Sequence, residues 1–394
     1  MLAILKFLGK ALLFLVIAFG LLTTIVPRFL DRIYYRGPDS GHFDGERFFN
    51  PDGDEDTVRP PGGGSRGGFF WRYLTGRDGR PPWPDHVPVR AATRAELAAP
   101  PNGMRATWVG HATVLVQTAG LNILTDPIWS ERAGPFGFGP RRVAKPGLAF
   151  DDLPKIDLVL ISHNHYDHMD LATLQRLWDR DRPLIVTSLG NDAILRSRGI
   201  GVQAADWGRA VAVPGRPARV IVNRNHHWGS RWFADRNRAL WSSFVVQLPG
   251  GNLFFAVDTG MGDGRWPAEA RRYGPIRLAL IPIGAFRFTP GQMFSGSHIG
   301  PIYAAEIHDR LGASTSIPIH WGTFRLSYEQ YRTPPRLLAA TVACTGQTGF
   351  DAVRIGRPVD VPPISARPPR PAAPRMTSDQ LERCLDTPAV RALR

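Results

Sequence analysis

The sequence predicts an α/β protein, with layers of helices covering β-sheets, preceded by an N-terminal transmembrane helix. Three observations support this class. Between residues 105 and 360, apolar segments of strand length alternate with segments of helix length. Several of these strands are apolar at every position, as expected when both faces of a sheet are covered. The first 26 residues contain only two charged side chains, Lys6 and Lys10.

Residues 1–27 are predicted to be a transmembrane anchor. The uncharged run from 11 to 26, with its apolar flank, is long enough to cross a bilayer if the lysines snorkel. A cleaved signal peptide is the alternative, but no Ala-x-Ala-like site precedes Pro27. The side of the membrane stays open, because basic residues flank the segment almost equally. These are Lys6, Lys10, Arg28, Arg32 and Arg36.

Two irregular segments flank the predicted body. Residues 28–104 form a Gly/Pro-rich arm, which we expect to dock on the body through its aromatic residues. Residues 361–394 form a Pro/Arg-rich tail with a short helix at 377–385. The two cysteines, Cys344 and Cys384, allow one disulfide and no thiolate metal site. The aromatic residues of the arm include Phe48, Phe49, Phe69, Phe70 and Trp71.

The body, residues 105–360, is predicted to be one domain of helix-covered sheets. Its strands are short apolar runs bounded by Gly, Pro, Asn or Asp, whereas its helices are longer and partly polar. The predicted strands are 109–116, 121–124, 156–162, 184–188, 220–225, a hairpin within 241–258, 278–283, 315–319 and 352–355. The predicted helices are 171–179, 192–198, 301–311 and 327–341.

Four potential metal ligands follow the strand 156–162 within six residues. They are His163, His165, Asp167 and His168. The end of a buried strand is rigid, so the loop after it can direct alternate side chains to one point. Imidazole and carboxylate groups suit zinc or a similar divalent ion. The run therefore predicts part of a site for two metal ions.

Further ligands are expected at later strand ends, where the same pocket can be reached. The pair His226-His227 follows the strand 220–225, Asp258 ends the hairpin, and His320 follows the strand 315–319. One ion would be held by His163, His165 and His227, the other by Asp167, His168 and His320, with Asp258 as a bridging carboxylate.

These motifs resemble the metallo-β-lactamase superfamily of hydrolases, and within it the branch of the N-acylphosphatidylethanolamine-hydrolysing phospholipase D. The similarity extends over about 104–345. His-x-His-x-Asp-His marks the superfamily, and the other shared strings are specific to the branch. Those strings are Thr107-Trp108-Val109-Gly110-His111, Leu124-Thr125-Asp126-Pro127, His227-Trp228, Asp258-Thr259-Gly260, Ile281-Pro282-Ile283-Gly284-Ala285 and Ile319-His320-Trp321-Gly322-Thr323.

The resemblance implies an αββα sandwich, with a site for two Zn²⁺ or other divalent ions at one edge between the sheets. It selects His227 over His226 as a ligand, because the ligand of the family immediately precedes the Trp. His226 then becomes a neighbour of the ligands.

The expected reaction is hydrolysis of a phosphodiester in a lipid. A pair of divalent ions can lower the pKa of a water toward neutrality. Asp167 would ligate one ion while orienting the water or accepting its proton. His298 is a candidate hydrogen-bond donor to the substrate phosphate, or a proton carrier. The sequence after it departs from the family, because Ile299-Gly300-Pro301 replaces an acidic helix start.

Two residues are candidates for a supporting role. Asp126 is either a hydrogen-bond partner of a ligating histidine or an ordinary Asp-Pro turn. His111, placed within the predicted strand 109–116, is expected to be buried and hydrogen-bonded rather than a ligand.

The loop 129–140 has Phe136 and Phe138 among glycines. It is either a mobile apolar wall over the site or a plain surface loop. It leads into Arg141-Arg142, which could meet a phosphate.

The net charge of +14 indicates an anionic partner, or else an arginine-rich composition that keeps the surface solvated, since the arginines are scattered along the chain. With an N-terminal anchor, a phospholipid membrane is favoured over nucleic acid. Lactone or other ester hydrolysis is the alternative enzymatic reading. A class B β-lactamase would need a cysteine at the site, and a glyoxalase II-like thioesterase would need a helical substrate domain. A membrane-tethered metal-binding protein is the non-enzymatic alternative, although one structural ion needs only four ligands.

Overall fold

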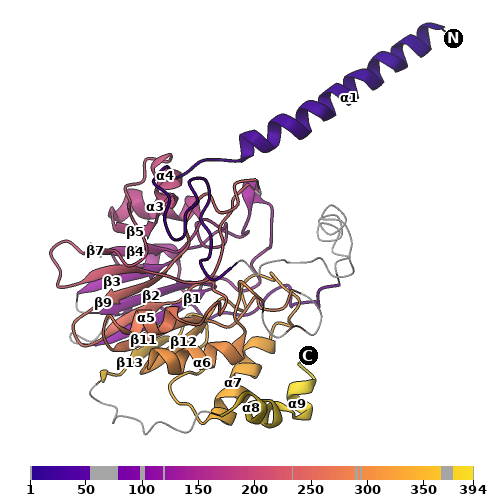
Figure 1. The fold of residues 1–394 in the computed structure, drawn as a ribbon. Helices are drawn as coiled ribbons and strands as arrows, with labels where there is room; N and C mark the ends of the chain where they lie inside the picture. The colour runs from indigo at the N-terminus through magenta and orange to yellow at the C-terminus, as the bar shows by residue number, and fades with distance from the viewer. Residues whose placement is uncertain are drawn as a thin grey trace.

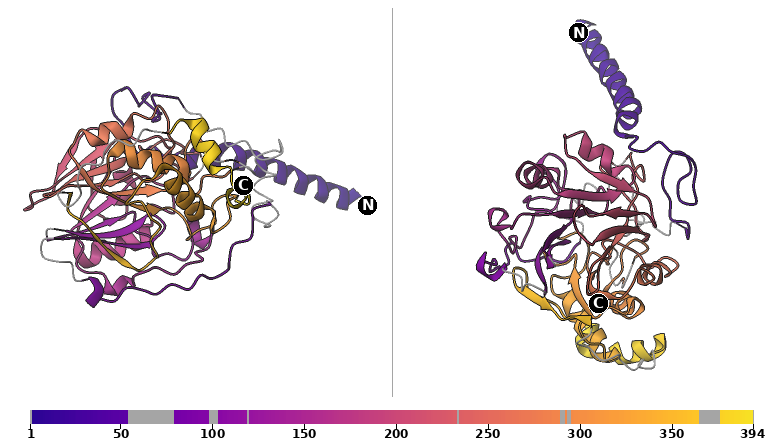
Figure 2. Two further views of the ribbon diagram at one scale, coloured as in Figure 1. Left: turned by 90° about the horizontal axis from the view of Figure 1, so that it is seen from below. Right: turned by 90° about the vertical axis from the view of Figure 1, so that its left-hand side faces the viewer.

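Two β-sheets pack face to face, with helices on both outer faces (Figure 1). This computed structural model describes residues 2–53, 79–97, 103–118, 120–232, 234–288, 292, 295–364 and 376–393. Figure 2 shows the same layers from two further directions. The predicted two-sheet architecture covered by helices is therefore confirmed.

The first sheet has seven strands among the described residues, in the order β13-β1-β2-β3-β4-β5-β6. Strands β1 to β3 are antiparallel neighbours, and β3 to β6 are parallel. The parallel strands therefore end at the same edge. The strands are β1 (Met104–Gly110), β2 (Thr113–Thr118), β3 (Leu121–Thr125), β4 (Leu158–Ile161), β5 (Leu184–Ser188), β6 (Gln203–Ala205) and β13 (Pro358–Val361).

The second sheet has six strands in the described part of the chain, in the order β12-β11-β10-β9-β8-β7. Strands β7 to β10 are antiparallel, whereas β10, β11 and β12 are parallel. The strands are β7 (Ala210–Ala212), β8 (Arg219–Asn223), β9 (Ser243–Gln247), β10 (Asn252–Phe255), β11 (Ile276–Pro282) and β12 (Thr315–Ile319).

Three hydrophobic layers hold the sandwich together. The central layer joins the two sheets through fully buried side chains such as Val116, Leu160, Phe244 and Leu280. Each such side chain contributes about 1.5–3 kcal/mol by leaving water. The outer layers cover the first sheet with α3 (Leu171–Asp181) and α4 (Asn191–Arg196), and the second with α5 (Trp266–Arg271), α6 (Pro301–Leu311) and α7 (Thr333–Thr345).

Most predicted elements are present, with β5 and β12 at the predicted bounds. The single strand predicted at 109–116 is wrong. The chain reverses at His111, which has a φ of 54°, so β1 and β2 form a hairpin. The strand predicted at 352–355 is also wrong, because the edge strand β13 lies a few residues later and pairs with β1. Apolar pattern alone does not reveal so tight a turn.

The N-terminal helix α1 (Leu2–Leu30) projects away from the body, and its apolar side chains are exposed (Figures 1 and 2). The segment Lys6–Leu30 is long and apolar enough to cross a membrane. Asp31, one residue after the helix, is fixed to the body. Its carboxylate accepts hydrogen bonds from Arg238 (2.7 and 2.8 Å) and from Arg47 (3.0 Å).

The described part of the arm packs on the body. Phe43 and Phe48 are buried against Leu240 and Trp241. Asn50 donates to the carbonyl oxygen of His227 at 2.9 Å and so reaches the site itself. The predictions that concern Phe69, Phe70 and Trp71 lie outside the described residues.

The C-terminal helices are joined to the body by the disulfide Cys344–Cys384. It connects α7 to α8 (Ser378–Leu385), which continues to α9 (Pro388–Arg391). Leu385 and Val390 are buried against Phe286 and Leu337. The tail thus packs on the body at its C-terminal end.

Removal of the disulfide by Cys384→Ser should lower the free energy of unfolding by about 2–4 kcal/mol, because the bridge closes a long loop in the unfolded chain. The sequence separation is 40 residues. Denaturant unfolding with and without reductant measures the change. Reductant should destabilise the natural chain and leave Cys384→Ser unaffected. An equal response of both proteins would contradict the prediction.

Candidate metal centre

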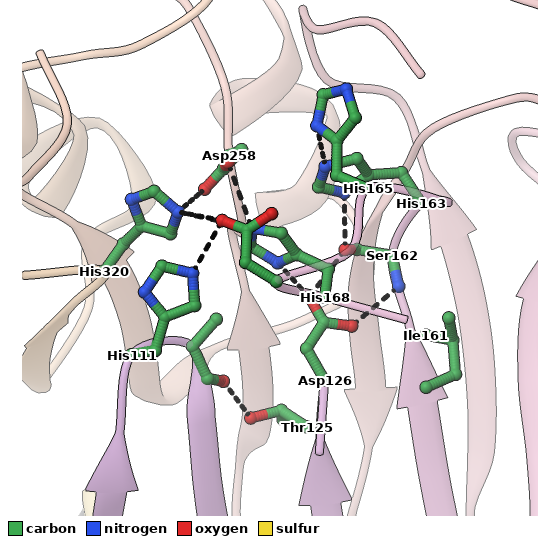
Figure 3. Close-up of polar contacts among 12 residues, drawn as sticks. His111, Thr125, Asp126, Ile161, Ser162, His163, His165, His168, Asp258 and His320 are labelled. Atoms are coloured by element: carbon green, nitrogen blue, oxygen red, sulfur yellow. Dashed lines mark hydrogen bonds and ion pairs between the residues drawn. The ribbon is translucent and has the colours of Figure 1, made fainter. Parts of the chain in front are cut away.

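The candidate site lies at one edge of the sandwich, beyond the ends of strands from both sheets (Figure 3). From the first sheet, Asp126 follows β3, and the run from His163 to His168 follows β4. From the second sheet, His227, Asp258 and His320 come after β8, β10 and β12. The sandwich therefore brings together ligands that are far apart in the sequence.

The structure gathers the seven predicted ligands into two adjoining groups. In each group, the potential ligand atoms all lie within 4.8 Å of one another. The first group is His163, His165, His227 and Asp258. The second is Asp167, His168 and His320, together with His111.

Asp258 lies between the two groups. Its Oδ2 is 3.1 Å from His168 Nε2 and 3.9 Å from His227 Nε2, and its Oδ1 is 2.9 Å from His320 Nε2. A single carboxylate thus contacts imidazoles of both groups. Its side chain is only 2% exposed, so water offers these charges little screening.

The histidine rings are oriented by hydrogen bonds on their Nδ1 atoms. His227 Nδ1 donates to the carbonyl oxygen of Ser297, and His320 Nδ1 to that of Gly284, both at 3.0 Å. His168 Nδ1 donates to Asp126 Oδ2 at 2.7 Å. In each ring, the Nε2 lone pair therefore faces the cluster, which is the usual arrangement around a protein-bound metal ion.

Asp126 is central to the hydrogen bonds that orient these histidines. It is fully buried and accepts hydrogen bonds from the backbone N–H and the hydroxyl group of Ser162, at 2.8 and 2.6 Å. Because the hydroxyl donates to Asp126, its oxygen can accept from His163 Nδ1 at 2.8 Å. One carboxylate thereby orients a histidine of each group. Sequence reasoning missed Ser162, although its place directly before the motif offered a signal.

His111 supports the second group from the turn between β1 and β2. Its Nε2 lies 2.9 Å from Asp167 Oδ2, and the ring packs against His320 with 4.1 Å between centroids. His111 is buried and hydrogen-bonded, so its environment matches the expectation even though the predicted strand does not exist.

Burial and the two carboxylates divide the histidines into two electrostatic classes. Burial lowers the pKa of His165 to about 3 and keeps the pKa of His163 and His227 well below the ordinary value. Burial also opposes the charged form of His320, but Asp258 and Asp167 outweigh it and raise its pKa to about 9. The carboxylates therefore require positive charge at their end of the site, from protons or from metal ions.

The donor set fits divalent ions. Neutral imidazoles with outward Nε2 atoms and a shared carboxylate are ligands typical of zinc and related metals. His165 differs from the other rings, because its Nδ1 faces the cluster, 2.8 Å from His163 Nε2 and 3.4 Å from His227 Nε2. Its Nε2 is buried and has no hydrogen-bond partner among the described residues.

Two further histidines lie beside the groups. His298 Nδ1 is 3.9 Å from Asp258 Oδ2, and its ring is 5.0 Å from that of His227. His226 points away from the cluster and contacts Asp52 of the arm at 3.1 Å. Burial lowers the pKa of His298 to about 3, so this ring is neutral and can donate one hydrogen bond.

Arg141 and Arg142, which the sequence suggested as phosphate contacts, differ from each other in their surroundings. Arg142 is buried, donates to the carbonyl oxygen of Ile128 at 2.8 Å and stacks on Phe324. Its contacts stabilise the loop 129–140. Arg141 is exposed on the surface. At the tip of the loop, Phe136 and Phe138 are exposed.

The fold and the site define a metal-dependent hydrolase. Residues 121–321 match the family described as the beta-lactamase superfamily domain. The chain therefore belongs to the metallo-β-lactamase superfamily.

Individual relatives give a more specific comparison than the superfamily does. The chain is 34% identical to N-acyl-phosphatidylethanolamine-hydrolyzing phospholipase D 1 of Caenorhabditis elegans over 245 residues, 60% of this chain and 68% of that protein. It is 32% identical to the mitochondrial phospholipase D of the same description from Saccharomyces cerevisiae, over 59% of this chain and 50% of that one. Igni18, a metallo hydrolase from Ignicoccus hospitalis, shares the fold with a TM-score of 0.51 and 19% identity, over 66% of this chain and 99% of that one.

Substitution Asp126→Asn should weaken metal binding about 10- to 100-fold, because the amide no longer provides the buried charge that orients His168. Equilibrium dialysis against Zn²⁺ measures the affinity. Asp351→Asn, at an exposed carboxylate, is the matched control and should bind as the natural chain does. Unchanged affinity in Asp126→Asn would show that the contact is merely structural.

Substitution Asp258→Asn should remove at least one bound ion and nearly all turnover, because the bridging carboxylate is lost. Metal content per chain, determined by elemental analysis of the purified protein, is the measurement. Circular dichroism should show that the variant remains folded. Full metal content together with natural activity would contradict the assignment of Asp258.

Proposed function

We propose that the protein is a phosphodiesterase of phospholipase D type that hydrolyses N-acylphosphatidylethanolamine-like lipids at a membrane to which α1 anchors it. The observation that carries the proposal is the buried carboxylate Asp258 placed between two groups of imidazoles. Such a site suits hydrolysis assisted by two metal ions. The identity to the phospholipases of Caenorhabditis elegans and Saccharomyces cerevisiae supports the lipid substrate.

Two divalent ions, held by the seven predicted ligands, would supply a water of lowered pKa and stabilise negative charge on the phosphoryl oxygens. In the reaction, the oxygen of water bonds to phosphorus, and the bond from phosphorus to the N-acylethanolamine oxygen breaks. Phosphatidic acid and the free alcohol are the products.

Asp167 is placed to handle the proton of the attacking water. Its Oδ2 is engaged by His111 Nε2 at 2.9 Å and lies 3.6 Å from His320 Nε2. These contacts fix the carboxylate beside the second group, where it can orient the water. The neighbouring imidazoles, chiefly His168, hold the pKa of Asp167 well below its ordinary value despite burial, so the group is ionised at neutral pH.

His298 is placed to bind the substrate phosphate. Its side chain is 11% exposed and lies beside the bridging carboxylate. A neutral ring can donate a hydrogen bond to a phosphoryl oxygen, and this role fits its lowered pKa better than general acid catalysis at neutral pH.

Membrane anchoring by α1 would give the site its substrate in the plane of the bilayer. Arg28 lies in the last turn of the apolar helix and Arg32 follows its end, and both side chains favour anionic headgroups. The net charge of +14 also favours binding to a membrane with anionic headgroups.

Incubation of the purified, metal-loaded protein with a panel of phospholipids and lactones should yield phosphatidic acid from N-acylphosphatidylethanolamine. Mass spectrometry of the products identifies the bond cleaved, and oxygen from ¹⁸O-labelled water should appear in the phosphatidic acid. Asp258→Asn serves as the inactive control. Opened lactones without any phospholipid cleavage would replace the proposal with the lactonase alternative.

A further inference from the structure

We propose that the loop 129–140 is a second membrane contact, which inserts Phe136 and Phe138 into the bilayer beside α1. The inference rests on the proposed anchoring by α1. It assigns to this loop a role other than that of a wall over the metal site. The partner is a phospholipid bilayer surface.

The exposure of the two phenylalanines is the first observation. Phe136 is 84% exposed and Phe138 is 70% exposed. Outside α1, the other large hydrophobic side chains exposed among the described residues are Ile33 and Met376. Ile33 belongs to the segment just after α1, so this exposed side chain lies where the helix joins the body.

The second observation is that the base of the loop, at Gly134 and Gly139, is closely packed. A Cβ at Gly134 would lie 2.3 Å from the carbonyl oxygen of Phe138, and one at Gly139 would lie 2.4 Å from that of Ala133. The two chain segments at the base of the loop therefore approach each other more closely than residues with a Cβ atom allow. Arg132 closes the base further by donating to the carbonyl oxygen of Gly139 at 2.9 Å.

The third observation is that the loop and the base of α1 share one groove. The groove has a volume of about 890 Å³. Its lining includes Arg32, Ile33 and Tyr34 from the segment after α1 and Gly134, Pro135 and Phe136 from the loop. A bilayer crossed by α1 must pass close to this groove.

The contacts between the residues after α1 and the body leave the face with the groove little freedom to move away from the membrane. Asp31 follows the helix directly and is bound by Arg238 and Arg47. Three residues further, the Tyr34 hydroxyl donates to Asp235 Oδ2 at 2.8 Å. These contacts hold the body against the end of the helix, so its adjoining face must lie at the membrane surface.

The charge of the groove suits a bilayer. Arg32, Arg132 and Arg198 line it and are exposed, whereas its acidic residues are Glu131 and Asp170. Asp170 is already engaged, because it accepts from backbone N–H groups at the start of α3. Exposed aromatic rings next to arginines are the usual composition of a surface that enters the headgroup region.

The same groove reaches the loop that carries the metal ligands. Tyr166 and Met169 line it, and the Arg231 guanidinium stacks on Tyr166 at 3.9 Å. Arg231 also donates to the carbonyl oxygens of Asn164 and Met169, both at 3.0 Å. The membrane-facing surface and the ligand loop are therefore packed together.

The test measures the depth of the loop in a bilayer with the full chain. Phe136→Cys, labelled with an environment-sensitive fluorophore, is inserted in nanodiscs of phosphatidylcholine and phosphatidylglycerol. Cys344 and Cys384 stay bonded, so only the new thiol reacts. Lipids carrying a nitroxide in the upper acyl chain should quench this label several-fold more strongly than a label at Ala389→Cys. Ala389 is exposed on α9, at the end of the molecule opposite α1 (Figures 1 and 2).

Equal quenching at the two positions would overturn the proposal. A blue-shifted emission at position 136 without quenching by nitroxide lipids would also overturn it, because it would indicate a protein contact such as a second copy of the chain. The readout requires no turnover. A protein that cleaves no phospholipid yet shows strong quenching would refute the proposed reaction and leave the membrane contact standing.

Discussion

The concentration of ionisable groups at one buried edge is the constraint on which the rest of the structure depends. Asp258 is buried and Asp167 is mostly buried, and both lie among several imidazoles. An unpaired buried charge costs several kcal/mol, so these carboxylates need cations held at fixed positions. Metal ions or protons must supply that charge, and the surrounding groups determine which nitrogen atoms can take part.

The backbone is held in unfavourable conformations at the same edge. His111, Asp126, Val257, Ala285 and His320 all have positive φ values, between 28° and 63°. Non-glycine residues rarely adopt such angles, and each costs of order 1–3 kcal/mol. Burial of the sandwich core provides stability that offsets this cost. The strain places ligands and their supports at strand ends, where regular backbone would direct them elsewhere.

The sequence was sufficient for the fold class because buried strands and amphipathic helices leave distinct patterns, as in β5 and β12. It also indicated the members of both groups apart from His111, which was expected to be a buried, hydrogen-bonded residue rather than a ligand; four of the others lie in one short run. The turn at His111 could not be predicted, because the apolar pattern continues through it. The contact of Ser162 with both Asp126 and His163 depends on tertiary packing, as does the carbonyl support of His227 and His320.

Under the proposed anchoring by α1, the contacts between this helix and the body determine how the site meets a lipid substrate. A flexible linker would let the body rotate freely, and each encounter with a lipid would need a new orientation. The Asp31 contacts remove most of that freedom within one residue of α1. An orientation fixed in advance reduces the entropy lost when substrate binds, which is the same advantage that orientation gives to reacting groups. The contacts of Arg231 extend this order to the ligand loop. If α1 crosses the membrane as proposed, the bilayer, the groove and the candidate metal centre have one defined relative orientation.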